Sequence, residues 1–134
     1  MNLLARWPYK WFGPWREYGP AYQRCPSVQE FVNPSVNANY DKARLRHYLS
    51  EATIVASTSR INFPCPFTGR RTTGPLSFRT DGHWLWLDDL PDYIDNHNVA
   101  IPDAFLRDIE SNGYVPPQFD SNAMEHLEWP PASA

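Results

Sequence analysis

The dipeptide Asp81-Gly82 constrains the fold of this chain more than any other two residues in it. Asp-Gly between two apolar segments is a strong signal for a two-residue β-hairpin loop of type I′, because that turn needs positive φ at both central positions. The flanking segments Leu76–Thr80 and His83–Leu87 have the length and residue types of strands. The sequence therefore predicts an antiparallel hairpin over residues 76–87.

A two-residue loop also determines which residues of the two strands face each other. The predicted pairs are Thr80–His83, Arg79–Trp84, Phe78–Leu85, Ser77–Trp86 and Leu76–Leu87. Because side chains alternate between the two faces of a strand, one face is apolar and should contact the core. Trp84 and Trp86 fall on the other face, where the Arg79 guanidinium can stack on Trp84. Trp84 is therefore either part of a second hydrophobic layer or an anchor for a partner.

The remaining elements are predicted to be short, since the chain contains 14 prolines and each restricts a helix. Four short helices are indicated by capping residues and apolar spacing. The first runs from Ser27, which forms a capping box with Glu30, to about Val32, and the second runs from Tyr40, capped by Asn39, to about Ser50. The third runs from Leu90 to about Asn96 and is capped by Asp88 or Asp89. The fourth runs from Pro102 to Asn112. Residues 53–59 are predicted to form a strand, and residues 62–69 a turn-rich connection, because Pro64 and Pro66 cannot lie in a central strand.

Together these signals predict the α+β class, with a small antiparallel sheet built on the 76–87 hairpin and packed with three or four short helices. With 134 residues the chain is expected to form a single domain. Residues 1–26 are rich in aromatic rings without any helical or strand period, which predicts an irregular segment held by its rings. Residues 117–134 are expected to be a loosely ordered tail that Trp129 can anchor.

The charges divide sharply along the chain. Residues 1–80 hold 11 of the 12 Lys and Arg but 4 of the 15 Asp and Glu, a balance of +7, whereas residues 81–134 hold Arg107 against 11 acids, a balance of -10. One explanation is that the two halves neutralise each other within the fold. The other is an acidic face that steers a basic partner and repels nucleic acid.

A partner-binding surface, if the second half carries one, should combine an aromatic anchor with exposed carboxylates. Asp88, Asp92 and Asp95 are expected on the outward side of the predicted 90–96 helix. The candidate partner-binding residues are Trp84, Asp88, Asp89, Asp92, Asp95, Asp103, Asp108 and Glu110.

No convincing catalytic or metal-binding set is present in the sequence, so an enzyme, a metal and a cofactor are not expected. The cysteines and histidines lack the spacing of a zinc site. One alternative is a small cysteine-dependent enzyme that uses Cys65 with His47 or His83. Another is a nucleic-acid-binding module that uses the N-terminal aromatic residues and arginines for stacking and phosphate contacts.

The sequence also favours a location in the cytoplasm. Its first residues, MNLLARWPYKWFGPW, place Arg and Pro where a signal peptide needs an unbroken apolar segment. No apolar stretch approaches the length of about 20 residues that a membrane span needs. Two cysteines are too few for a disulfide framework, and both are expected to be reduced.

Two long segments resemble a group of small bacterial immunity proteins that protect against contact-dependent growth inhibition and related polymorphic toxins. The segments are RWPYKWFGPWREYGPAYQRCPSVQEFV and STSRINFPCPFTGRRTTGPLSFRTDGHWLWLDDLPDYIDNHNVAIP, and the resemblance covers about residues 7–116. Its most specific part is Thr-Asp-Gly-x-Trp-x-Trp followed by Leu-Pro-x-Tyr-Ile. Similar stretches also occur in bacterial proteins of uncharacterised function.

The resemblance implies a cytosolic, non-enzymatic inhibitor that binds the C-terminal toxin domain of its own system, as a monomer in that complex. Such toxins are often nucleases with basic grooves, and the acidic half would then mimic nucleic acid and block the active site. Immunity proteins share neither a fold nor binding residues. The resemblance therefore assigns no role to any single residue.

Overall fold

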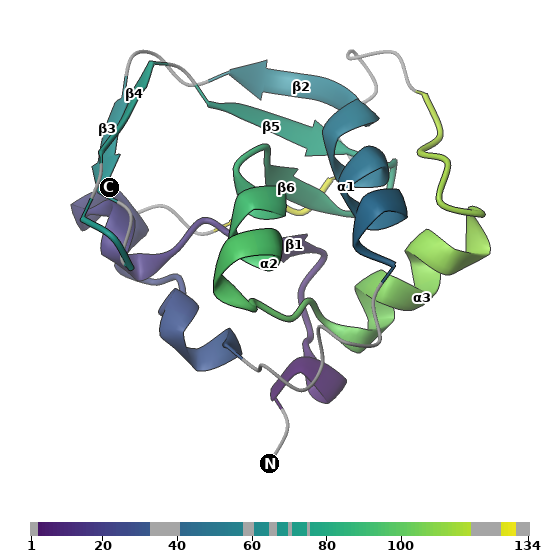
Figure 1. Cartoon of the computed structure of the whole chain (residues 1–134), viewed down its shortest axis with the longest axis horizontal. Coiled ribbons are helices and arrows are strands. Elements are labelled where there is room, and N and C mark those ends of the chain that lie inside the picture. The colour runs from purple at the N-terminus through teal and green to yellow at the C-terminus, as the bar shows by residue number, and fades with distance from the viewer. Residues whose placement is uncertain are drawn as a thin grey trace.

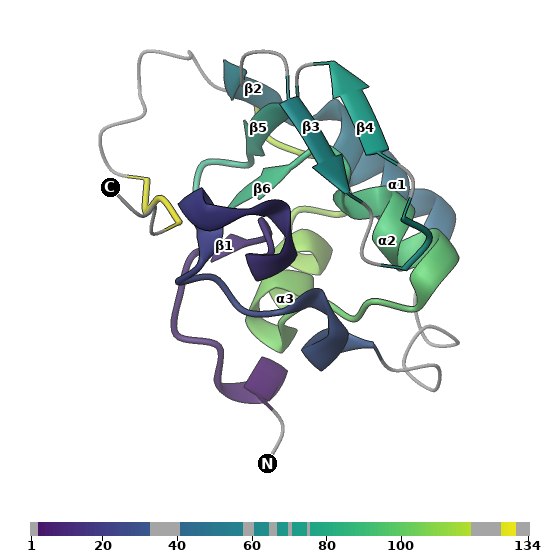
Figure 2. The same ribbon diagram turned by 90° about the vertical axis from the view of Figure 1, so that its left-hand side faces the viewer.

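The computed structural model describes residues 3–32, 41–57, 61–64, 67–69, 71–74, 76–118 and 127–130. Its main sheet has four strands in the order β1-β6-β5-β2, namely β1 (Trp11–Phe12), β2 (Thr53–Ser57), β5 (Ser77–Thr80) and β6 (Leu85–Leu87). Helices α1 (Lys42–Glu51) and α2 (Leu90–His97) lie side by side on one side of this sheet, and α3 (Asp103–Ser111) lies below them (Figures 1 and 2). The predicted α+β class with a hairpin-based sheet is confirmed.

Two features of the strands differ from the prediction. β1 pairs with β6 in parallel, so the main sheet is mixed and not purely antiparallel. A separate two-stranded hairpin forms from β3 (Ile61–Pro64) and β4 (Arg71–Gly74), so residues 62–64 of the predicted turn-rich connection lie in a strand. Pro64 is compatible with this hairpin because it pairs at the end of a two-stranded ribbon, where the missing N–H costs little.

The β5–β6 hairpin forms as predicted, but its register was predicted wrongly. The observed pairs are Phe78–Leu87, Arg79–Trp86 and Thr80–Leu85, which leaves a four-residue loop over residues 81–84. Asp81 Oδ1 accepts hydrogen bonds from the backbone N–H of His83 at 3.0 Å and of Trp84 at 2.8 Å. These bonds replace the ladder bonds of a type I′ turn, because an Asp side chain can compete for nearby amides. The register shifts by two residues, so each side chain keeps its predicted face.

Helix caps confirm part of the prediction. The capping box forms at a 3₁₀ helix (Val28–Phe31), where Ser27 Oγ accepts from the Gln29 N–H at 3.2 Å and Glu30 Oε2 accepts from the Ser27 N–H at 3.1 Å. α1 begins two residues later than predicted and is capped by Asp41, whose Oδ1 accepts from the Arg44 N–H at 3.2 Å. The predicted cap Asn39 lies outside the described residues.

The N-terminal aromatic residues form much of the core. Residues 3–22 contain β1 and three 3₁₀ helices, Leu3–Arg6, Arg16–Tyr18 and Pro20–Tyr22. Trp11, Phe12 and Trp15 are buried, and Phe12 packs edge-on against Trp15 with 5.2 Å between ring centroids. The prediction of an irregular segment held by its rings therefore describes this region well, although it missed the short parallel strand.

Both tryptophans of the hairpin are fully buried. Trp86 Nε1 donates to the Leu49 carbonyl oxygen at 3.0 Å, which ties β6 to α1. On the opposite side of the sheet, Trp129 packs edge-on against Phe78 with 5.3 Å between ring centroids. This contact agrees with the predicted anchoring of the tail, of which residues 127–130 are described after 118. None of the described helices is long and apolar enough to cross a membrane.

Replacing Asp81 tests the four-residue loop. Asp81→Ala removes the acceptor for two loop amides and for the Tyr48 hydroxyl, which donates to Asp81 Oδ2 at 2.6 Å. We expect the free energy of unfolding, measured by urea denaturation, to fall by about 2–4 kcal/mol. Asp81→Asn retains Oδ1 as an acceptor and should lose clearly less. An alanine variant as stable as the wild type would show that the side chain does not hold this loop.

Candidate functional site

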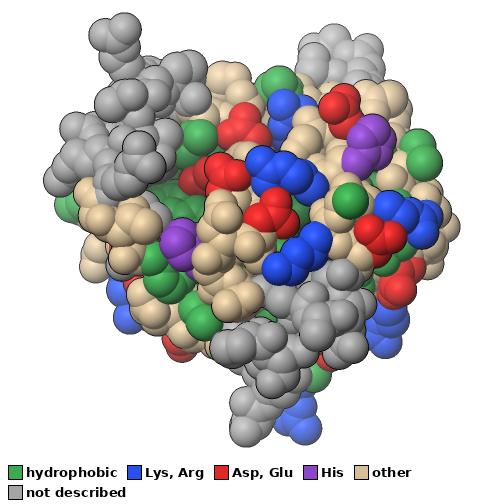
Figure 3. All heavy atoms as spheres, viewed as in Figure 1, with side chains coloured by type: hydrophobic (Ala, Val, Ile, Leu, Met, Phe, Trp, Pro, Cys, Tyr) green, Lys and Arg blue, Asp and Glu red, His purple; other side chains and the backbone are tan. Residues whose placement is uncertain are grey.

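The outward side of α2 carries two of the predicted carboxylates, Asp92 and Asp95, and both form ion pairs within the protein. The Arg46 guanidinium of α1 contacts both, with 2.5 Å from Nη1 to Asp95 Oδ2 and 3.1 Å from Nη2 to Asp92 Oδ1. The side chains remain accessible, since 64% of Asp92 and 49% of Arg46 is exposed. Figure 3 shows acidic and basic side chains alternating on this face. Of the two explanations for the charge division, neutralisation within the fold therefore applies to Asp92 and Asp95.

Asp89 was predicted as a partner-binding carboxylate and, with Asp88, as a candidate cap of the helix. It occupies the N-cap position of α2, but its side chain turns inward. Its Oδ2 accepts a hydrogen bond from the Tyr18 hydroxyl, and the Tyr18 and Tyr93 hydroxyl oxygens are 2.9 Å apart. The residue keeps some contact with solvent, but its carboxylate lies deep, and no side-chain cap bond forms at α2. Desolvation raises the pKa of Asp89 from 3.8 to about 7, although the Tyr18 bond opposes this change. Burial likewise raises the pKa of Tyr18, so its hydroxyl stays protonated and donates.

Trp84 and Asp108 bind each other within the fold. Trp84 Nε1 donates to Asp108 Oδ2 at 2.7 Å, and the indole stacks on Phe105 with 4.6 Å between centroids and 9° between planes. The exposed fraction of Trp84 is 0%, so its ring cannot be the aromatic anchor that the sequence suggested. The Lys10 ammonium, not Arg79, approaches this ring, at 5.0 Å from its centroid. Trp84 lies on the same side of the hairpin as Trp86, whose ring also contacts Phe105, and this side is covered by α1 and α3.

Asp88, Asp103 and Glu110 complete the predicted set. Asp103 and Glu110 are exposed near the two ends of α3, and Asp88 is half-buried before α2. In the described part of the chain, none of the three carboxylates forms an ion pair. The carboxylates left at the surface are therefore Asp88, Asp92, Asp95, Asp103 and Glu110, which we call the α2–α3 acidic surface.

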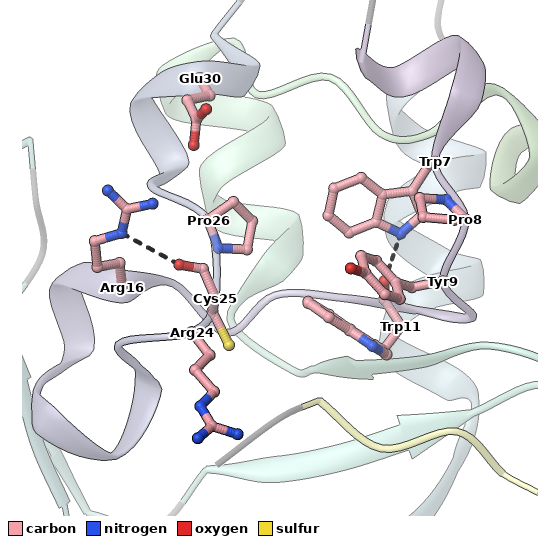
Figure 4. Close-up of a pocket in the computed structure, with 9 residues that line it drawn as sticks. All are labelled: Trp7, Pro8, Tyr9, Trp11, Arg16, Arg24, Cys25, Pro26 and Glu30. Atoms are coloured by element: carbon pink, nitrogen blue, oxygen red, sulfur yellow. Dashed lines mark hydrogen bonds between the residues drawn. The ribbon is translucent and has the colours of Figure 1, made fainter. Parts of the chain in front are cut away.

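A second feature is a hollow of about 320 Å³ beside the N-terminal segment (Figure 4). The rings of Trp7, Tyr9 and Trp11 lie on one side of it, and the loop of Arg24, Cys25 and Pro26 lies on the other. Its remaining lining residues are Pro8, Arg16 and Glu30. Sequence reasoning missed this hollow, because its residues follow no period and only the tertiary fold brings them together.

The first alternative function is a cysteine-dependent enzyme that uses Cys65. Cys65 lies outside the described residues, so the cysteine-dependent enzyme is not tested. Burial raises the pKa of the other cysteine, Cys25, to about 11, which keeps that thiol protonated and unreactive at neutral pH. Within the described ranges, no group of three or more His, Cys, Asp or Glu could hold a metal ion.

The nucleic-acid alternative requires a series of exposed rings on which successive bases can stack. The N-terminal rings do not provide it, because Trp7, Trp11, Phe12, Trp15 and Tyr18 are buried. Tyr9, with 44% of its surface exposed, is the most open ring in the described part of this segment. It could stack with one base but not with a strand.

Comparison with known proteins found no matching family model, no matching curated protein and no matching solved structure. The function must therefore be inferred from residues and geometry. The α2–α3 acidic surface and the N-terminal hollow are the two features that carry such an inference.

The buried Asp89 carboxylate predicts a pH-dependent stability. Because its pKa in the folded protein is raised to about 7, the protonated form stabilises the fold, and this contribution is complete below about pH 4. It is lost as the pH rises toward 7, so the wild type should lose about 1 kcal/mol of unfolding free energy per pH unit relative to Asp89→Asn. Urea titrations from pH 4 to 8 measure this difference.

The variant Asp103→Asn is the matched control, because it removes an exposed carboxylate of α3 that is not among the groups that shift the pKa of Asp89. It should show the same slope as the wild type. Equal stability of the wild type and Asp89→Asn at every pH would contradict the raised pKa.

Proposed function

We propose that this protein is a non-enzymatic immunity protein that binds a basic toxin domain and occludes its active site. The observation that carries this proposal is the charge of residues 88–110, which hold seven carboxylates and Arg107 as their one cation. Among the described residues, Arg46 is the one cation from elsewhere that pairs with them. The segment therefore keeps a negative excess after its internal ion pairs are counted.

The α2–α3 acidic surface is the proposed docking face. Its carboxylates lie on or next to two helices whose apolar sides are buried in the core, so their backbone positions are set before a partner arrives. Acidic residues on a pre-formed surface accelerate the encounter with a basic partner and disfavour wrong partners. Trp84, Asp89 and Asp108 are not part of this face, because each is already engaged inside the protein.

The resemblance to immunity proteins agrees with this chemistry. In that setting the partner is the C-terminal toxin domain of the same system, and a nuclease with a basic groove has the matching charge. Binding occurs in the cytoplasm, requires no cofactor, and involves one copy of this chain per toxin domain.

Neutralising the exposed carboxylates tests the proposal. The triple variant Asp88→Asn, Asp103→Asn and Glu110→Gln should bind the toxin domain encoded by the neighbouring reading frame with about tenfold slower association at low salt. Surface plasmon resonance at several salt concentrations measures the rate. Glu51→Gln, on the exposed side of α1, is the control and should associate like the wild type. An unchanged rate for the triple variant would rule out this surface as the docking face.

Arg46 makes a second, opposite prediction. Its guanidinium occupies Asp92 and Asp95, so it competes with any cation that the partner offers to them. Arg46→Gln should therefore speed association a few-fold, while its cost in stability stays within about 1 kcal/mol because both ion pairs are exposed. Slower association of this variant would show instead that Arg46 itself contacts the partner.

A further inference from the structure

We infer that the N-terminal hollow is a binding site for a small ligand that combines a flat aromatic ring with a phosphate group. The inference rests on the lining residues alone and is independent of the proposed immunity function. The hollow has an aromatic wall, two arginines and a volume of about 320 Å³ (Figure 4). That volume lies near the lower end of the range of about 300–1,000 Å³ for small-molecule sites.

The aromatic wall is rigid and offers one open ring. Tyr9 stacks on Trp11 with 4.9 Å between centroids and 22° between planes, and it meets Trp7 edge-on at 5.4 Å. Trp7 Nε1 donates to the Trp11 carbonyl oxygen at 2.8 Å, which fixes the two indoles relative to each other. With 44% of its surface exposed, Tyr9 is the ring on which a flat ligand can stack.

The two arginines supply positive charge to the lining of the hollow. Arg16 Nε donates to the Cys25 carbonyl oxygen at 3.3 Å, which orients this guanidinium. Within the part of the chain that the structure describes, neither Arg16 nor Arg24 forms an ion pair with a carboxylate. Guanidinium groups bind phosphate through several parallel hydrogen bonds, so either arginine could receive the phosphate of a bound ligand. Figure 4 shows the two guanidinium groups on different sides of Cys25.

The other lining groups are compatible with an anion. Glu30 is the one carboxylate in the lining, and its Oε2 already accepts the Ser27 N–H at 3.1 Å. Together with the two arginines it leaves the hollow with a net positive charge. Cys25 is a protonated thiol at neutral pH and does not repel an anion. A cationic ligand is disfavoured for the same reasons.

The size and the single open ring point to one nucleotide-like unit and not to a nucleic-acid strand. Adenosine 5′-monophosphate (AMP) is therefore the probe, with adenosine and ribose 5-phosphate as its two separated parts. The full-length protein is titrated with each while NMR follows the Trp7 indole N–H. The Trp84 indole N–H, which is bonded to Asp108 elsewhere in the fold, serves as an internal reference. We expect AMP to shift the Trp7 signal and each part to bind at least about tenfold more weakly.

Three single variants locate the phosphate. Arg24→Gln should weaken AMP binding about tenfold, since a charge-assisted contact is lost. Glu30→Gln keeps a capping-box residue but removes the negative charge, so it should strengthen binding a few-fold. Arg6→Gln, an exposed arginine of the same segment outside the hollow, should change nothing. A purely structural role of Arg24 and Glu30 would not give opposite effects.

The inference is overturned if AMP leaves the Trp7 signal unchanged at millimolar concentration, if adenosine binds as well as AMP, or if Arg24→Gln binds like the wild type. A 5′-phosphorylated dinucleotide distinguishes the source of the ligand. Binding equal to that of AMP indicates a free nucleotide, and much tighter binding indicates the end of a strand, while the ring-and-phosphate site stands in both cases. Arg24→Gln should also bind the toxin domain normally, which separates this inference from the proposed function.

Discussion

The buried carboxylate of Asp81 is the interaction on which the arrangement of the sheet and helices depends. It accepts two backbone amides of its own loop and the Tyr48 hydroxyl of α1, and 1% of the residue is exposed. A buried carboxylate is costly unless its oxygens are hydrogen-bonded, so these three donors must be held in place together. The loop, the register of β5 with β6 and the position of α1 are therefore coupled through one side chain.

The two tryptophans of the hairpin belong to the core, on the side of the sheet that α1 and α3 cover. A two-residue turn would have extended the strands and paired Trp84 with Arg79. The four-residue loop instead leaves Trp84 outside the ladder, and its ring, on the same side as Trp86, stacks on Phe105 and bonds to Asp108. The aromatic residues that stand next to acidic residues in the sequence are thus part of the core. One carboxylate, that of Asp108, accepts the hydrogen bond of the buried Trp84 indole N–H.

The charge division along the chain has two consequences in three dimensions. Part of it is internal, because α1 from the basic half packs beside α2 from the acidic half and Arg46 bridges two carboxylates. Part of it remains at the surface, on α3 and before α2, and supports the proposed encounter with a basic protein. In the basic half, Arg16 and Arg24 border the hollow, so part of its positive charge lies beside the N-terminal rings.

The sequence by itself determined the α+β class, the hairpin at Asp81-Gly82, the capping box at Ser27 and the apolar sides of α2 and α3. Each of these is encoded by neighbours within one turn or one hairpin, where local geometry and periodicity decide. Only the tertiary structure decided five other features. These are the register of β5 and β6, the parallel pairing of β1, the pairing of Arg46 with α2, the burial of Asp89 and the N-terminal hollow. They join residues far apart in the chain, such as Tyr18 with Asp89, and the energy of a buried hydrogen bond or ion pair depends on surroundings that no local pattern contains.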